Sequence, residues 1–179
     1  MPGHSHSDTL NFVLYSKENP FIVDTGISTY DSNDRRKIER STSSHNTVKI
    51  KNFEQSEVWS SFRVARRISP QIIIDNKECI KAYLDYETTT ARHIRNFQFN
   101  EDNIIIDDSI IYKDTANSYL HFHPKVELIL RDNVIQTNFG NIYINGAKSI
   151  KIKEYQYAPR FNVLIPSKKA IINFKKDIN

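Results

Sequence analysis

The chain has 179 residues, a length that suits one domain with a hydrophobic core of its own. Its single cysteine, Cys79, excludes an internal disulfide and a cysteine-based zinc site. The formal net charge is +4, but 21 acidic residues are interspersed with 25 basic ones. This balance allows a polyanionic ligand and does not indicate nucleic acid as a partner.

No run of apolar residues is long enough to span a bilayer. The first six residues, MPGHSH, lack the basic and apolar regions of a signal peptide. We therefore expect a soluble chain with no membrane partner. A histidine-rich motif that begins at the fourth residue, without any structural lead-in, also suggests a fragment of a longer protein.

Short runs rich in Ile, Val, Phe and Tyr recur with polar turns between them, which is typical of antiparallel strands. In chain order, we expect strands at 10–15, 21–24, 46–50, 57–67, 71–75, 79–86, 94–99, 103–107, 119–123, 126–130, 133–137, 141–144, 149–155, 161–165 and 170–174. No long amphipathic helix competes with this pattern. It predicts an all-β fold in which two large antiparallel sheets pack face to face, a supersandwich-like β-sandwich. The alternation of apolar and polar residues predicts that the core contains Phe12, Tyr15, Trp59, Phe62 and the alternating isoleucines.

The segment 29–44 interrupts the strand pattern, because it is polar and longer than hairpin loops usually are. Long loops of this kind often hold functional residues. Arg35, Arg36 and Arg40 lie in it, and guanidinium groups pair well with planar oxyanions such as carboxylate or sulfate. A solvated charged loop explains the three arginines equally well.

Histidines and a carboxylate near the start of the chain are candidates for a metal site. His4 and His6 project from one face if their segment is extended. Asp24 ends an apolar strand, and His45 lies where the polar segment enters the next strand. Each has an ordinary explanation alone, as a solvated terminus, a turn cap or a hydrogen-bonded loop residue. Together, two histidines and one carboxylate that leave a position open are a recognised zinc ligand set.

His121 and His123 also alternate along one expected strand, which raises the question of a second metal site. Pro124 ends that strand, and hydrogen-bond partners alone are enough to explain the pair. We favour that explanation.

Three stretches together resemble the C-terminal domain of heparinase II/III proteins and of related alginate lyases. They read GHSHSDTLNF at 3–12, VDTGISTY at 23–30 and ERSTSSHNTV at 39–48. The stretches QSEVWSSFRVARR at 55–67 and HFHP at 121–124 also resemble that family. The resemblance is specific over residues 3–67, weaker to about residue 124, and rests on the fold pattern beyond.

The resemblance implies one C-terminal β-sandwich domain, residues 1–179, of a lyase that cleaves uronate-containing polysaccharides by β-elimination. In such lyases the sandwich holds a structural zinc ion through residues that match His6, Asp24 and His45. The first histidine of the motif, here His4, faces the cleft and helps to bind or neutralise the substrate carboxylate. A sandwich tyrosine takes part in some relatives; the matching stretch 35–40 has none, and Tyr30 is the nearest substitute.

The same resemblance implies two partners, an acidic uronate polysaccharide and an N-terminal α/α-toroid domain that this chain lacks. Because the toroid carries the main catalytic residues, the chain alone is expected to be inactive or nearly so. The three arginines of segment 29–44 become candidates for uronate or sulfate binding. Relatives are often periplasmic, which places the full-length protein in the periplasm or cell envelope.

Two other classes of protein remain open at this point. One is a non-catalytic carbohydrate-binding or structural sandwich, in which a metal only pins loops. The other is a cupin-like metalloenzyme, since cupins also combine His-x-His, a carboxylate and a later histidine on strands. A cupin-type site needs a glutamate a few residues after the first two histidines, and here Glu18 falls on an expected turn.

Overall fold

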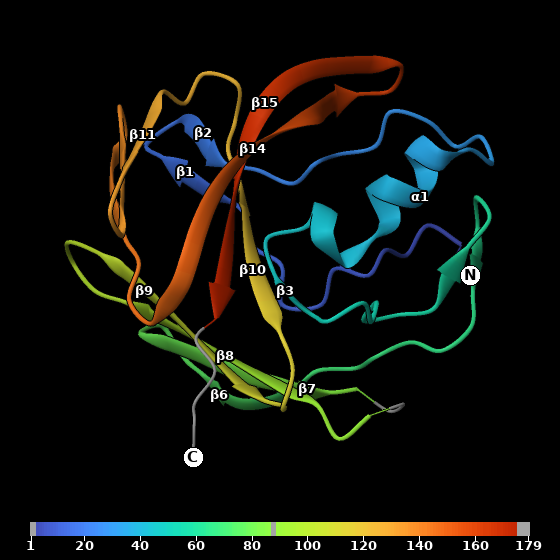
Figure 1. Ribbon diagram of the computed structural model, residues 1–179, viewed down its shortest axis with the longest axis horizontal. Helices are drawn as coiled ribbons and strands as arrows, with labels where there is room; N and C mark the ends of the chain where they lie inside the picture. Colours follow the sequence, from blue (N-terminus) through green and yellow to red (C-terminus); the bar gives the residue numbers. More distant parts are fainter. Residues whose placement is uncertain (1–2, 87–88, 175–179) are drawn as a thin grey trace.

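The computed structural model describes residues 3–86 and 89–174, and antiparallel strands make up most of them (Figure 1). The strands are β1 (Leu14–Ser16), β2 (Asn19–Ile22), β3 (Val48–Ile50), β4 (Val58–Trp59), β5 (Arg63–Val64), β6 (Gln71–Asp75), β7 (Cys79–Asp85), β8 (Arg92–Phe99), β9 (Ile104–Ile111), β10 (Ala116–His121), β11 (Leu128–Arg131), β12 (Val134–Thr137), β13 (Gly140–Tyr143), β14 (Ala147–Arg160) and β15 (Val163–Phe174). The helices are α1 (Asp34–Arg40) and the 3-10 turn η1 (Thr42–Ser44).

Two four-stranded sheets form the centre of the molecule, with the orders β14-β15-β10-β3 and β6-β7-β8-β9. A three-stranded sheet, β11-β12-β13, and the hairpins β1-β2 and β4-β5 complete the described part of the fold. Every strand pair in these sheets is antiparallel. The predicted all-β sandwich without a long helix is confirmed.

One face of the β14-β15-β10-β3 sheet buries two clusters of apolar side chains. The cluster beside β1, β2 and the three-stranded sheet contains Phe21, Ile22, Phe122, Val126, Ile135, Ile144, Ala147 and Ala170. The cluster beside β7 contains Val48, Ile50, Leu84, Tyr86, Ala91 and Ala116. Burying apolar surface at roughly 25 cal/mol per Å² makes these two clusters the main stabilising element of the fold.

The inward face of the β6-β7-β8-β9 sheet carries a buried ionic network beside apolar side chains such as Leu84. Arg95 and Asp108 are paired directly across β8 and β9, and the guanidinium donates to both carboxylate oxygens at 2.7 and 2.8 Å. His93 Nε2 lies 2.7 Å from the same carboxylate. Arg95 also donates to the carbonyl oxygens of Leu10 and Asn46, so it connects this sheet to the N-terminal segment and to the start of the segment that leads into β3.

Several strand and core predictions need correction. The expected strand 57–67 is a short hairpin, because the chain turns between β4 and β5, where Ser60 has a φ of 53°. The expected strands 161–165 and 170–174 are parts of the single strand β15. Tyr15, Trp59 and Phe62 are exposed and not in the core.

The alternating isoleucines are also less buried than predicted. The exposed isoleucines of the sheet β6-β7-β8-β9 are Ile72, Ile73, Ile74, Ile80, Ile104, Ile105 and Ile111. Some of them, such as Ile80, lie on the same face as the buried Leu84 but beyond the part of the sheet that is covered. Apolar alternation therefore marked the strands correctly and did not show which isoleucines are covered.

The polar segment 29–44 folds into α1 and η1. Asn33 caps the helix by accepting a hydrogen bond from the Arg36 backbone N–H at 2.9 Å, Asp34 lies in the first turn, and Arg40 lies in the last. These positions suit the helix dipole. None of the helices among the described residues is long and apolar enough to cross a membrane.

Candidate functional site

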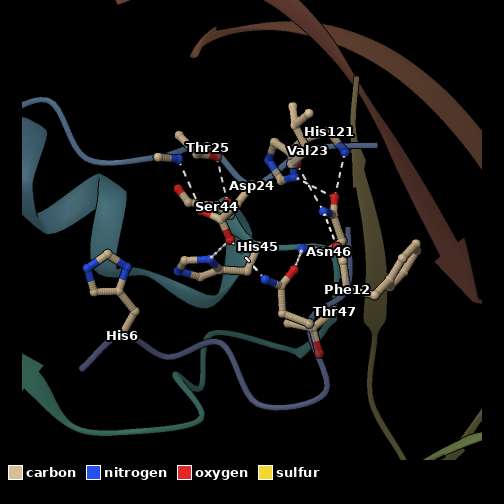
Figure 2. A network of polar contacts seen from close by, with 12 residues as sticks. His6, Phe12, Val23, Asp24, Thr25, Ser44, His45, Asn46, Thr47 and His121 are labelled. Atoms are coloured by element: carbon tan, nitrogen blue, oxygen red, sulfur yellow. Dashed lines mark hydrogen bonds and ion pairs between the residues drawn. The ribbon is translucent and has the colours of Figure 1, made fainter. Parts of the chain in front are cut away.

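The centre of the candidate site is a buried contact between Asp24 and His45. Asp24 follows β2, and His45 follows η1. His45 Nδ1 donates to Asp24 Oδ2 at 2.7 Å, and the same oxygen accepts from Asn11 Nδ2 at 2.9 Å (Figure 2). Burial alone would raise the pKa of Asp24, but the hydrogen bond and charge of His45 lower it overall. Asp24 is therefore an ionised acceptor.

The other ring nitrogen of His45 is left without a partner. His45 is fully buried, and its Nε2 has no hydrogen-bond partner among the described residues. A buried imidazole nitrogen without a partner is costly unless something occupies it. In the neutral imidazole tautomer that donates from Nδ1 to Asp24, Nε2 is the nitrogen that carries a lone pair.

His6 lies beside this pair and is held by Arg36. The His6 and His45 ring centroids are 5.3 Å apart (Figure 2). Arg36 Nη1 lies 3.0 Å from His6 Nε2, and since a guanidinium only donates, this nitrogen accepts. Burial, with smaller contributions from His45 and Arg36, lowers the pKa of His6 to about 3. The imidazole is neutral at physiological pH.

These residues line an open pocket of about 450 Å³. Its wall contains His4, His6, Asp8, Asp24, Gly26, Ile27, His45, Ala158, Pro159 and Arg160. Within this wall, burial raises the pKa of the Asp8 carboxyl. The pocket thus combines neutral and basic side chains with two carboxyl groups.

Gly26 allows the tip of the β14-β15 hairpin to close one side of the pocket. The Ala158 backbone N–H donates to the Thr25 carbonyl at 2.8 Å. Gly26 has a φ of +80°, and a Cβ at this position would lie 2.0 Å from the Ala158 carbonyl oxygen. Only glycine fits both the backbone conformation and the close approach.

The two predicted catalytic residues, His4 and Tyr30, lie together at the edge of the pocket. Their ring centroids are 5.4 Å apart in an edge-to-face arrangement. Phe62 makes the same kind of contact with His4 at 5.4 Å. His4 therefore contacts aromatic rings while it lines the pocket.

The predicted anion-binding residue Arg40 is buried in the protein. Its guanidinium donates to the carbonyl oxygens of Ser5, Trp59, Ser60 and Arg63. This arrangement fixes the β4-β5 hairpin against the segment that carries His4 and His6. Its burial does not favour contact with a ligand, and the solvated-loop explanation is also wrong for this residue.

Arg35 and Arg36 are likewise engaged with protein atoms. Arg36 is fully buried, donates to His6, and lies over the Tyr30 ring at 5.1 Å. Arg35 bridges Glu39 at 2.8 Å and the Gln156 carbonyl on β14 at 2.9 Å. Both arginines position the walls of the pocket.

Sequence reasoning assigned no role to two residues that matter here, Arg160 and Asn46. Arg160 is exposed, lines the pocket from the β14-β15 hairpin, and no local motif marks it. Asn46 is fully buried, and its Nδ2 donates to the carbonyls of Phe12 and Val23 (Figure 2). The only sequence signal for Asn46 was its place directly after His45 in a stretch that resembles the family.

The two later histidines have separate surroundings. His121 is buried, and its backbone N–H and Nδ1 both contact Asn46 Oδ1, at 2.7 and 3.2 Å. His123 packs its ring against Tyr157 at 5.5 Å. His121 Nε2, like that of His45, is buried and has no hydrogen-bond partner among the described residues.

The donor set at the pocket fits zinc in its chemistry. His6 is neutral and Asp24 is ionised, which are the protonation states that zinc ligands need. His45 Nε2 is buried and has no hydrogen-bond partner among the described residues. Within residues 3–86 and 89–174, however, no three His, Cys, Asp or Glu side chains converge in the arrangement of a metal site. His6 Nε2 accepts from Arg36, so zinc binding through this nitrogen requires Arg36 Nη1 to withdraw.

Fold and site together define a β-sandwich domain with a histidine-lined open pocket over a buried Asp–His pair. The model of the family "Heparinase II/III-like, C-terminal" matches residues 1–178. The chain therefore belongs to the heparinase II/III-like family and corresponds to its C-terminal domain. None of the curated proteins matches the chain.

Solved structures of the same fold include a heparinase III, the BT4657 gene product, and the heparan sulfate lyase HepC from Pedobacter heparinus. The first is 19% identical, with a TM-score of 0.74 over 97% of this chain. The second is 15% identical, with a TM-score of 0.72 over 95% of this chain. The match spans 28% of each of those chains. At this identity the similarity establishes the fold.

Proposed function

We propose that this chain is the sandwich domain of a lyase that cleaves uronate-containing polysaccharides by β-elimination. The observation that carries the proposal is the partly buried Asp24–His45 pair in an open pocket lined by His4 and His6. Family membership over residues 1–178 supports the reaction class. We also propose that an α/α-toroid domain is the catalytic partner of this sandwich domain.

The chemistry of β-elimination explains the residue types in the pocket. The C5 proton of a uronate is weakly acidic, so its removal needs a neutralised carboxylate, a base at C5 and an acid at the departing O4 oxygen. We assign carboxylate neutralisation to His4, with the exposed Arg160 as an additional cation on the same wall. Tyr30, whose ring contacts that of His4, is this domain's candidate for proton transfer.

The proposed zinc ion has a structural role, with His6, Asp24 and His45 as ligands. When bound, it would supply fixed positive charge and join three segments of the pocket wall. It would also give the buried Nε2 of His45 a partner. A structural metal contributes directly to folding free energy, so its removal lowers stability.

Metal analysis and thermal melting test the zinc assignment. Purified chain is expected to contain one zinc ion and to melt at lower temperature after chelation. His6→Ala should lose the metal and the effect of chelator, and His123→Ala, a histidine outside the pocket wall, should keep both. A metal-free wild type that is unaffected by added zinc or chelator refutes the zinc assignment.

A lyase assay tests the reaction. The chain is incubated with heparan sulfate and alginate, alone and fused to the α/α-toroid of a heparinase III relative, and unsaturated uronate is measured by its ultraviolet absorbance. Product is expected only from the fusion, and His4→Ala should lower its rate. Saccharide binding without product in the fusion would favour the alternative of a non-catalytic carbohydrate-binding sandwich. The cupin-like alternative is not carried forward, because the described strands form open sheets.

A further inference from the structure

Three aromatic side chains stack on one another at the surface of the molecule. The Tyr30 ring lies 5.6 Å from Phe62 and 5.7 Å from Phe161, with interplanar angles of 24° and 27°. Their exposed fractions are 37%, 47% and 52%, respectively. Exposed apolar groups that cluster in this way usually mark an interaction site. We call Tyr30, Phe62 and Phe161 the aromatic ridge.

The aromatic ridge is assembled from three distant parts of the chain and is held in place. Tyr30 precedes α1, Phe62 lies in the turn between β4 and β5, and Phe161 lies at the tip of the β14-β15 hairpin. The hairpin tip is fixed by the backbone hydrogen bond from Asn162 to Ser28 at 2.9 Å. This support means that the fold presents the rings as a preformed surface.

The aromatic ridge borders the pocket. His4 lines the pocket and also contacts the Tyr30 and Phe62 rings edge-on. Arg160, another lining residue, directly precedes Phe161. A molecule lying in the pocket and extending past His4 or Arg160 therefore reaches the aromatic ridge.

We infer that the aromatic ridge binds a sugar residue of the polysaccharide next to the unit held in the pocket, an inference that rests on the proposed function. A pyranose presents a face of C–H groups that packs on aromatic rings, and hydroxyl or carboxylate groups around its edge. The aromatic ridge supplies the rings, and Arg160 and His4 supply polar partners beside them.

The test is calorimetric titration of the chain with a heparan sulfate hexasaccharide. Phe62→Ala and Phe161→Ala should each weaken binding roughly 3- to 10-fold, the range expected for loss of one aromatic contact. The same fold-loss should persist at about 0.5 M NaCl, because salt screens charge pairs and not apolar contacts. Tyr143→Ala, which removes an exposed ring from β13, should leave affinity unchanged.

Further variants separate the aromatic ridge from the rest of the proposal. Phe161→Leu keeps an apolar side chain without a ring and should bind as weakly as Phe161→Ala. Full affinity in Phe161→Leu would overturn stacking of the saccharide on the aromatic ring. Unchanged affinity in both alanine variants, or no hexasaccharide binding by wild type, overturns the inference. The zinc and product assays judge the proposed function independently, and circular dichroism melts verify that each variant folds.

Discussion

Asn46→Ala should destabilise the fold strongly, although Asn46 is not a proposed ligand. Its side chain is fully buried and makes three short hydrogen bonds, to the Phe12 carbonyl at 2.8 Å, to the Val23 carbonyl at 3.0 Å and from the His121 backbone N–H at 2.7 Å. Alanine leaves all three backbone groups without this partner. Each unpaired buried group costs about 1–3 kcal/mol, so the free energy of unfolding should fall by about 3–9 kcal/mol.

Urea denaturation followed by circular dichroism measures this loss, and thermal melting should give a Tm lower by about 10–20 °C. Asn141→Ala is the matched control, because Asn141 is exposed on β13 and should change stability by less than about 0.5 kcal/mol. A loss below about 1 kcal/mol in Asn46→Ala would mean that the network around Asn46 does not hold these segments together.

Two further predictions concern the backbone and the pH dependence of stability. Gly26→Ala should lower the free energy of unfolding by several kcal/mol, because the new Cβ would lie 2.0 Å from the Ala158 carbonyl oxygen. Gly146 also has a positive φ, +75°, but has open space around it, so Gly146→Ala should cost only about 1–2 kcal/mol of backbone strain. Melting both variants isolates the close contact, and equal losses would refute it. Burial lowers the pKa of His93 below 6.5. Burial alone would raise the pKa of Asp108, but Arg95 and His93 lower it overall, to below 3.8. As the pH falls, each group binds its proton at a higher pH in the unfolded chain than in the folded protein. The contribution of both groups to stability is therefore fully present above pH 6.5. It falls as the pH drops, first through the pKa of histidine and then through the pKa of aspartate in the unfolded chain. Urea midpoints between pH 7.5 and 4 should decline, and His93→Gln should decline less between pH 7 and 5; an identical decline would assign the effect to other groups.

The strand pattern was predictable because it depends on local alternation. Strand β6 coincides with the expected run 71–75, and β12 differs from its expected run by one residue. The failures have a common cause. A run of isoleucines fits a strand whichever face is covered, and coverage depends on the neighbouring sheet. In β8 and β9, Arg95 and Asp108 take covered positions, where they pair with each other and bind further polar partners.

The candidate site was predictable in its residue types and less so in their roles. Asp24 and His45 are 21 residues apart, and only their chemistry as possible zinc ligands and the resemblance to a family related them before the structure placed them 2.7 Å apart. Charge in segment 29–44 pointed to anion binding, yet Arg36 and Arg40 are buried. A sequence shows that a guanidinium is present and does not show which carbonyl oxygens will surround it. Arg160 was missed because only the fold of the long β14-β15 hairpin brings it to the pocket, and nothing near it in the sequence indicates this.

Arg36 connects the proposed metal site with the aromatic ridge. Its Nη1 occupies the lone pair of His6 Nε2, and the same guanidinium lies over the Tyr30 ring at 5.1 Å. Arginine stays protonated, so a metal ion that takes His6 Nε2 must displace a cation that cannot lose its charge. The displaced Nη1 then needs another acceptor, in a site where Nη2 already has no partner among the described residues. Arg36 thus both occupies His6 and supports the Tyr30 ring, so binding of the proposed zinc ion at His6 Nε2 would be expected to change the geometry of the aromatic ridge.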